Sequence, residues 1–133
     1  MKNRIEAQLR FNDIDILGHL NNTVYFSLYD LGKAKYMEEA GLREPGPKAP
    51  TSVIADVHCS YFKPVHYGDE IYIETHCSEV GDKHFTLDQE MVDGVGEIRS
   101  QCRTVMVYID PATGKAASLP QSYRDKIQQF ESL

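Results

Sequence analysis

Residues 10–30 read RFNDIDILGHLNNTVYFSLYD, a polar stretch that runs directly into an apolar, helix-like pattern. The helical pattern begins only near Val24, so residues 12–20 are expected to form a loop. Asn21 or Asn22 is a suitable N-cap for the helix that follows. The first backbone N–H groups of a helix have no partner within it, and the helix dipole is positive at that end. The stretch therefore predicts an anion or oxyanion site where a polar loop meets the start of a helix.

Outside this stretch, the chain alternates between strand-like runs and turns. Alternating polarity predicts a first strand over residues 4–11, and helical spacing predicts the helix over residues 23–42, with Gly41 as its stop. A loop with three prolines is expected over residues 43–50. Four further strands and a short terminal helix are expected at residues 52–62, 70–80, 84–92, 96–110 and 121–133.

This order of elements predicts an α+β fold. Four successive strands linked by hairpins, with a clear turn signal at Asp93-Gly94, would make an antiparallel sheet whose one face is covered by the helix. Gly32 lies within the helix, and its missing side chain is expected to allow close packing. Because one helix cannot cover both faces, the other face or an edge strand is expected to pair with a second subunit. We therefore expect a homodimer or homotetramer.

The composition is that of a globular protein. A chain of 133 residues is long enough for one domain with a core and too short for two ordinary ones, so a single domain over residues 1–133 is expected. A run of about 18 apolar residues, as a membrane span requires, is not found. The N-terminal sequence lacks the apolar region of a signal peptide. A formal net charge of −6 disfavours nucleic-acid binding, because neutralising phosphates requires a basic surface.

The cysteines give no sign of a metal or redox motif. Cys59, Cys77 and Cys102 are far apart and form no C-x-x-C spacing. Each lies in a strand-like run, where a free cysteine usually acts as a small core residue. A reducing compartment, most simply the cytoplasm, is therefore expected.

The loop before the helix has two candidate carboxylates, Asp13 and Asp15. Either could attack a bound group or activate water beside it, and Gly18 would let the backbone turn sharply. Each residue also has a plain structural interpretation: solvated loop carboxylates, asparagine caps, and a packing role for His19. A D-x-D pair with one nearby histidine lacks further ligands at metal-binding spacing, so no metal is expected.

Two segments carry a resemblance to a known family. The stretch FNDIDILGHLNNTVYFSLYDLGKAKYM, with its D-x-D-x-x-G-H-x-N-N motif, is similar to the active-site segment of hotdog-fold thioesterases related to 4-hydroxybenzoyl-CoA thioesterase. A second family segment, with Tyr-x-x-Pro and Gly-Asp in order, resembles the stretch HCSYFKPVHYGDEIYIETHCSEVGDKHFTL. The end of the last family strand resembles IDPATGKAASLP. The resemblance runs from about residue 4 to residue 124. It implies a hotdog fold, a curled antiparallel sheet wrapped around one long central helix, as a single thioesterase domain.

The resemblance also implies the reaction and its central groups. The substrate would be an acyl-CoA thioester, or an acyl-carrier-protein thioester, hydrolysed to free acid and thiol. By position, Asp15 matches the catalytic carboxylate, as nucleophile or general base, and the backbone N–H near Asn22 matches the oxyanion donor. Asp13 has no catalytic counterpart and is expected to be a loop or capping group.

Further positions of the motif would shape the substrate site. Gly18 and His19 match residues that form the turn beneath the thioester, Tyr25 an aromatic position near the acyl site, and Asp30 an acidic position one helical turn further in. The family usually has Arg where this chain has Lys33, and often Ser where it has His84.

Coenzyme A would be part of the substrate, so no separate cofactor is expected. Its phosphates would need cationic contacts, for which Lys63, Lys83 and His84 are the candidates. Tyr61, Tyr67 and Tyr72 could favour aromatic acyl groups, although core or interface roles are the preferred interpretation. Two other functions stay open. One is a non-catalytic acyl-CoA-binding protein, and the other is a hotdog hydratase or dehydratase that would set a histidine beside the aspartate.

Overall fold

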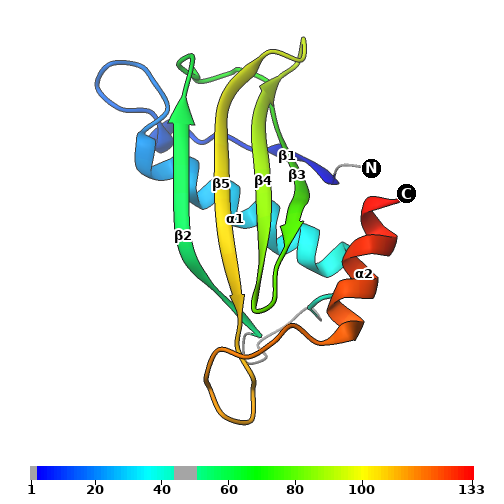
Figure 1. Ribbon diagram of the computed structural model, residues 1–133. Coiled ribbons are helices and arrows are strands. Elements are labelled where there is room, and N and C mark those ends of the chain that lie inside the picture. Colours follow the sequence, from blue (N-terminus) through cyan, green and yellow to red (C-terminus); the bar gives the residue numbers. More distant parts are fainter. Residues whose placement is uncertain (1–2, 44–50) are drawn as a thin grey trace.

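The computed structural model describes residues 3–43 and 51–133, and within them the element types follow the predicted order (Figure 1). The first half contains a short strand, a 3-10 turn and a helix: β1 (Asn3–Ala7), η1 (Phe11–Asp13) and α1 (Asn22–Glu39). Four strands and a second helix follow: β2 (Ser52–Tyr61), β3 (Ile71–Val80), β4 (His84–Asp93), β5 (Ile98–Tyr108) and α2 (Gln121–Glu131). The proline-rich loop expected at residues 43–50 lies outside the described residues but for Arg43.

The strands form one antiparallel sheet in the order β1-β3-β4-β5-β2, so the predicted α+β class is confirmed. The hairpins β3–β4 and β4–β5 are present as expected, but the prediction of four hairpin-linked strands is wrong for β2. β2 pairs with β5 at the far edge, and residues 62–70 cross the end of the sheet to reach β3 (Figure 1). The backbone N–H groups of Phe62 and Lys63 donate to the Arg99 carbonyl, which turns the chain away from a hairpin.

The first strand ends earlier than its alternating pattern predicts. β1 stops at Ala7, because the chain turns into η1, where the Asp13 N–H donates to the Arg10 carbonyl at 3.0 Å. The Asp13 carboxylate accepts in return from the Arg10 backbone N–H at 2.9 Å and pairs with its guanidinium. Asp13 is thus the loop-capping group that was expected.

The helix α1, of 18 residues, lies against one face of the sheet and contacts β1, β3 and β4. Asn21 is its N-cap, and Gly41, at φ +80°, follows its end. A Cβ on Gly32 would lie 2.7 Å from Gln89 Nε2 and 2.8 Å from Ile73 Cγ2, so the expected close packing is confirmed. Near the C-terminal end of α1, α2 packs against β3 and closes a second part of the core.

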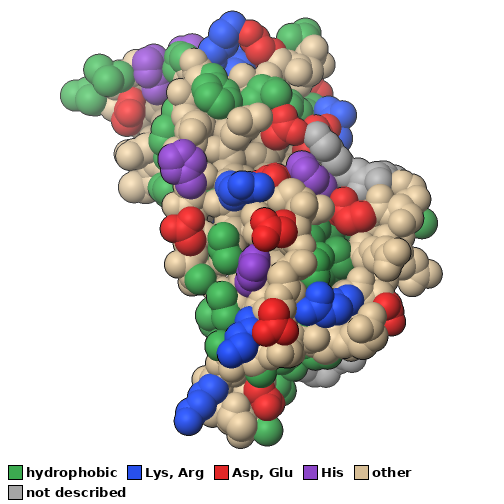
Figure 2. All heavy atoms as spheres, in the orientation of Figure 1, with side chains coloured by type: hydrophobic (Ala, Val, Ile, Leu, Met, Phe, Trp, Pro, Cys, Tyr) green, Lys and Arg blue, Asp and Glu red, His purple; other side chains and the backbone are tan. Residues whose placement is uncertain are grey.

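The other face of the sheet is polar. Figure 2 shows charged and histidine side chains distributed over this side of the molecule. Arg103 and Asp88 form an ion pair there at 3.1 Å, with His58 and His76 directly beside them in the strand register. The apolar side chains of the edge strand β2 are exposed instead, Val53 and Ile54 among them.

The three cysteines are free thiols, Cys102 buried and the other two half-buried. Among residues 3–43 and 51–133, no helix has the length and apolar character needed to span a membrane.

Candidate active site

The start of α1 leaves one backbone donor unused. Asn21 Oδ1 accepts from the Thr23 backbone N–H at 3.0 Å and from the Thr23 hydroxyl at 2.9 Å, while the Asn21 carbonyl accepts from Val24 N–H at 2.9 Å. The N–H of Asn22, the first helical residue, donates no hydrogen bond within the described part of the chain. An unpaired N–H at the positive end of a helix is a ready donor for an oxyanion.

Asp15 is held by its own loop through one carboxylate oxygen. Its Oδ1 accepts from the backbone N–H groups of Leu17 at 2.9 Å and His19 at 3.2 Å. The Asp15 N–H donates to the His19 carbonyl at 2.8 Å, and Gly18, at φ +80°, closes the turn by donating to the Asp15 carbonyl at 3.0 Å. Only a residue without a side chain adopts this left-handed conformation freely. Oδ2 takes part in no hydrogen bond among the residues described.

Asp15 and Asn22 line the same cavity, of about 360 Å³. The other lining residues come from the loop, α1 and the end of β2: His19, Leu20, Tyr25, Tyr61, Phe62, Lys63 and Pro64. Tyr25, only 4% exposed, packs edge to face against Tyr61 with ring centroids 4.8 Å apart. Burial raises the pKa of Tyr25, so this aromatic wall is uncharged at ordinary pH.

His19 supports the loop with its backbone and its ring. It forms a backbone bridge to His66, and the two rings pack edge to face at 5.2 Å. The next residue, Leu20, donates its N–H to the Val65 carbonyl at 2.7 Å. Within residues 3–43 and 51–133 the His19 ring makes no hydrogen bond to Asp15, although both residues line the cavity.

The structure does not bring every predicted residue to this cavity. Asp30 lines a larger one, of about 680 Å³, where it pairs with the buried Lys33 at 3.1 Å. Lys83 and His84 lie at the β3–β4 turn, at the opposite end of the sheet from the loop that carries Asp15 (Figure 1). Of the candidate phosphate contacts, only Lys63 is at the cavity, where it forms an ion pair with Glu97.

Part of the cavity wall was not predicted from the sequence. Leu20, Phe62 and Pro64 line it, and all three lie in the two quoted family segments, Pro64 as the proline of Tyr-x-x-Pro. Arg99, which binds the carbonyl of Pro64 at 2.7 Å, has no local sequence signal at all.

The chain is similar to known proteins over most of its length. A family model described as the thioesterase-like superfamily matches residues 9–127. The uncharacterized protein YsmA of Bacillus subtilis is 27% identical over 113 residues, which cover 85% of this chain and 76% of that protein.

Solved structures share the fold over nearly the whole length. A thioesterase from Thermus thermophilus, in complex with coenzyme A and Zn, has a TM-score of 0.85 at 27% identity, covering 98% of this chain and 95% of that one. An aspartate-to-asparagine mutant of 4-hydroxybenzoyl-CoA thioesterase in complex with 4-hydroxybenzoyl-CoA has a TM-score of 0.79 at 16% identity, covering 95% of this chain and 98% of that one. The second likeness shows the fold alone.

Proposed function

We propose that this chain, which belongs to the thioesterase-like superfamily, hydrolyses an acyl-CoA or acyl-carrier-protein thioester to a free acid and a thiol. One observation carries the proposal: Asp15 and the unused N–H of Asn22 lie on one cavity. A carboxylate and an oxyanion donor are the two groups that acyl transfer to water needs.

The Asn22 N–H would bind the thioester carbonyl oxygen. As the tetrahedral intermediate forms, negative charge develops on this oxygen, and the N–H and the positive end of α1 stabilise it. No side chain has to reorganise for this, because the N-cap already fixes the first turn of the helix.

Asp15 would supply the attack. Its Oδ1 is held by two backbone N–H groups, which leaves Oδ2 for chemistry. As a nucleophile, it would add to the carbonyl carbon and expel the thiolate, and water would then hydrolyse the mixed anhydride. As a general base, it would take a proton from the water that attacks. Both routes produce the same acid and thiol and use no metal or separate cofactor.

The cavity wall suggests how a substrate would be held. Tyr25 and Tyr61 would contact the acyl group, whereas Tyr67 packs on Phe11 and Tyr72 lies under Arg4, away from the cavity lining. Lys63 would contact a phosphate of coenzyme A. The Thermus thermophilus structure contains coenzyme A, which supports this ligand for the present chain.

A second subunit would complete the assembly. We also propose that residues 1–133 form a single hotdog domain, with the sheet curled around α1. This domain would assemble into a homodimer or homotetramer in the cytoplasm. The polar outer face favours association through the edge strand β2, whose apolar side chains Val53 and Ile54 are exposed. In such an assembly Asp30, Lys83 and His84 would have to reach substrate from a neighbouring subunit. Light scattering coupled to size exclusion tests the subunit count.

Thiol release tests the reaction itself. Wild-type protein is mixed with short, long and aromatic acyl-CoAs and a carrier-protein thioester, and free thiol is followed with a chromogenic thiol reagent. Turnover on one class supports the proposal and names the acyl group. Binding of acyl-CoA by calorimetry without thiol release would support a non-catalytic binding protein instead.

A further inference from the structure

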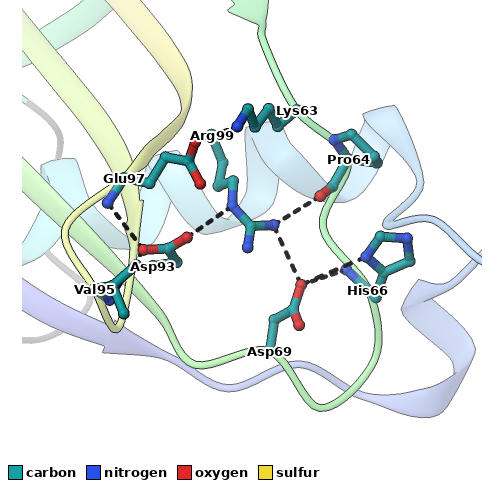
Figure 3. A network of polar contacts seen from close by, with 8 residues as sticks. All are labelled: Lys63, Pro64, His66, Asp69, Asp93, Val95, Glu97 and Arg99. Carbon is teal, nitrogen blue, oxygen red and sulfur yellow. Dashed lines mark hydrogen bonds and ion pairs between the residues drawn. The ribbon is translucent and has the colours of Figure 1, made fainter.

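Arg99, the second residue of β5, connects three parts of the chain at the end of the sheet (Figure 3). Its side chain is 16% exposed. Nε donates to Asp93 Oδ2 at 3.0 Å, while one terminal nitrogen donates to the Pro64 carbonyl at 2.7 Å and to Asp69 Oδ2 at 3.3 Å. A guanidinium has donors in a fixed planar fork, so it can bridge acceptors on two sides at once.

The carboxylates around Arg99 are themselves fixed. Asp93 Oδ1 accepts from the backbone N–H groups of Val95 at 3.0 Å and Glu97 at 2.9 Å, which closes the β4–β5 turn. The Glu97 N–H, with help from Val95 and Arg99, lowers the pKa of Asp93 against the opposing effect of burial. Burial alone would lower the pKa of Arg99, but hydrogen bonds to Asp93 and Asp69 raise it overall. The lowered pKa of Asp93 and the raised pKa of Arg99 both favour the charged forms of this ion pair.

The group that Arg99 holds is the wall segment, which we define as residues 62–66. Phe62, Lys63 and Pro64 of this segment line the cavity that contains Asp15. The Arg99 carbonyl accepts from the N–H groups of Phe62 at 2.9 Å and Lys63 at 3.2 Å. Both the backbone and the side chain of Arg99 thus bind the wall segment.

The wall segment is in turn bound to the loop that carries Asp15. Asp69 Oδ2, which accepts from Arg99, also accepts from the His66 N–H at 2.8 Å. His66 bridges to His19, and His19 N–H donates to Asp15 Oδ1 at 3.2 Å. The contacts form a continuous path from Arg99 to the carboxylate.

We infer that Arg99 is a positioning residue for the active site: it holds the wall segment, which through His19 holds the carboxylate of Asp15. The inference rests on the proposed thioesterase function and adds to it a residue 84 positions away in the sequence. Arg99 touches no reacting atom in this role. It acts by keeping Asp15 in place beside the oxyanion donor.

The substitution that tests this is Arg99→Gln, with Arg99→Lys as the conservative variant. Loss of the guanidinium removes the hydrogen bonds from Arg99 to the Pro64 carbonyl and to Asp69, so the wall segment and the Asp15 loop can shift. A shift of a reacting group by about 1 Å can cost about 10²-fold in rate. We expect kcat to fall about 10- to 100-fold, with a smaller change in KM. Lysine keeps the charge but not the fork, so it should restore activity only in part.

Arg103 on the same strand gives a matched control. Its Nε donates to Asp88 Oδ1 at 3.1 Å, an ion pair like that of Arg99 with Asp93, but Arg103 lies four residues further along β5 and does not line the cavity that contains Asp15. Arg103→Gln should leave kcat and KM as in the wild type. All variants are measured at a temperature where thermal melts show each of them folded.

Hydrogen exchange provides a readout that does not depend on turnover. In Arg99→Gln the amides of Leu17, His19 and Leu20 should exchange at least about tenfold faster, since the bonds that protect them are loosened. In Arg103→Gln they should exchange as in the wild type. In an Asp15→Asn background, Arg99→Gln should have little further effect on residual turnover, because both changes act on one group.

Two results would overturn the inference: unchanged exchange at these amides in Arg99→Gln, or faster exchange with unchanged kcat. If Arg99→Gln does not fold, Arg99→Lys decides by the same two measurements. A wild type that releases no thiol from any thioester would refute the proposed function separately, and the exchange data would still decide whether Arg99 holds the loop.

Discussion

Replacement of Asn22 by proline would remove the proposed oxyanion donor with little other change. Asn22 is the first residue of α1, where proline is well tolerated because the missing N–H has no helical partner and the fixed φ suits the helix. The Asn22 N–H donates no hydrogen bond within the described residues, so no internal bond is lost. Asn21 is extended, at ψ 136°, as a residue before proline prefers.

The size of the effect follows from the chemistry of the site. Removal of one oxyanion donor typically costs about 10²- to 10³-fold in kcat, or about 2.7 to 4 kcal/mol of transition-state stabilisation. We expect a loss of this size in Asn22→Pro, with the free energy of unfolding changed by less than about 1 kcal/mol. Thiol release at saturating acyl-CoA gives kcat, and urea unfolding gives the stability.

Asn22→Ala separates the backbone from the side chain, because it removes the amide side chain and keeps the N–H. It should retain kcat within a few-fold of the wild type. A folded Asn22→Pro protein with wild-type kcat would refute the assignment of this N–H. An equal loss in Asn22→Ala would instead point to the side chain.

Three other predictions concern packing, pH and substrate binding. Gly32→Ala would place a Cβ 2.7 Å from Gln89 Nε2. The overpacking should outweigh alanine's better helix propensity and lower the free energy of unfolding in urea by about 1 to 2 kcal/mol. An unchanged urea midpoint would contradict this close contact. The hydrogen bond from Arg10 lowers the pKa of Asp13 in the folded protein. The ionised Asp13 therefore stabilises the fold fully above its unfolded pKa of about 4, and this stabilisation is lost as pH falls through the lower folded pKa. Asp13→Asn should therefore destabilise the protein in urea at pH 7 more than at pH 2.5, and an equal effect at both would be inconsistent with the shift. Lys63→Gln should raise KM for acyl-CoA several-fold at low salt with kcat unchanged. The difference in KM between variant and wild type should shrink at high salt, because salt screens the attraction between Lys63 and the phosphates. An unaltered KM would show that Lys63 does not contact the phosphates.

Much of the local structure could be predicted from the sequence. The period of apolar residues located α1 and four of the strands to within a few residues, and the resemblance to the 4-hydroxybenzoyl-CoA thioesterase family is confirmed by the family match and the solved neighbours. The end of β1 was placed too late because Leu9 and Phe11 continue the alternation, although the Asp13–Arg10 contacts already turn the chain.

The order of the strands could not be predicted from local patterns. The pairing of β2 with β5 joins residues 39 to 56 positions apart, and the contacts of Arg99 with residues 62–64 at its end are encoded by no short motif. A hairpin between successive strands is the simpler expectation, and here it was wrong for β2.

The site was easier to predict where its residues are close in sequence. Asp15, His19, Asn22 and Tyr25 belong to one turn and the first turn of one helix, so local geometry alone brings them to one cavity. Asp30 lies five residues after Tyr25 on α1, a rotation of about 140°, and therefore points to another side of the helix. Lys83 and His84 follow a turn at the far end of the sheet, and only tertiary or quaternary structure can relate them to Asp15.

Thiol release by wild type and by Asp15→Asn decides whether Asp15 catalyses thioester hydrolysis at this cavity. Asparagine can keep Oδ1 as an acceptor for the N–H groups of Leu17 and His19, so the loop should stay folded. We expect kcat of Asp15→Asn on the best acyl-CoA to fall about 10²- to 10⁴-fold, with coenzyme A binding by calorimetry unchanged. Thiol release by Asp15→Asn at the wild-type rate would rule out a catalytic role for Asp15.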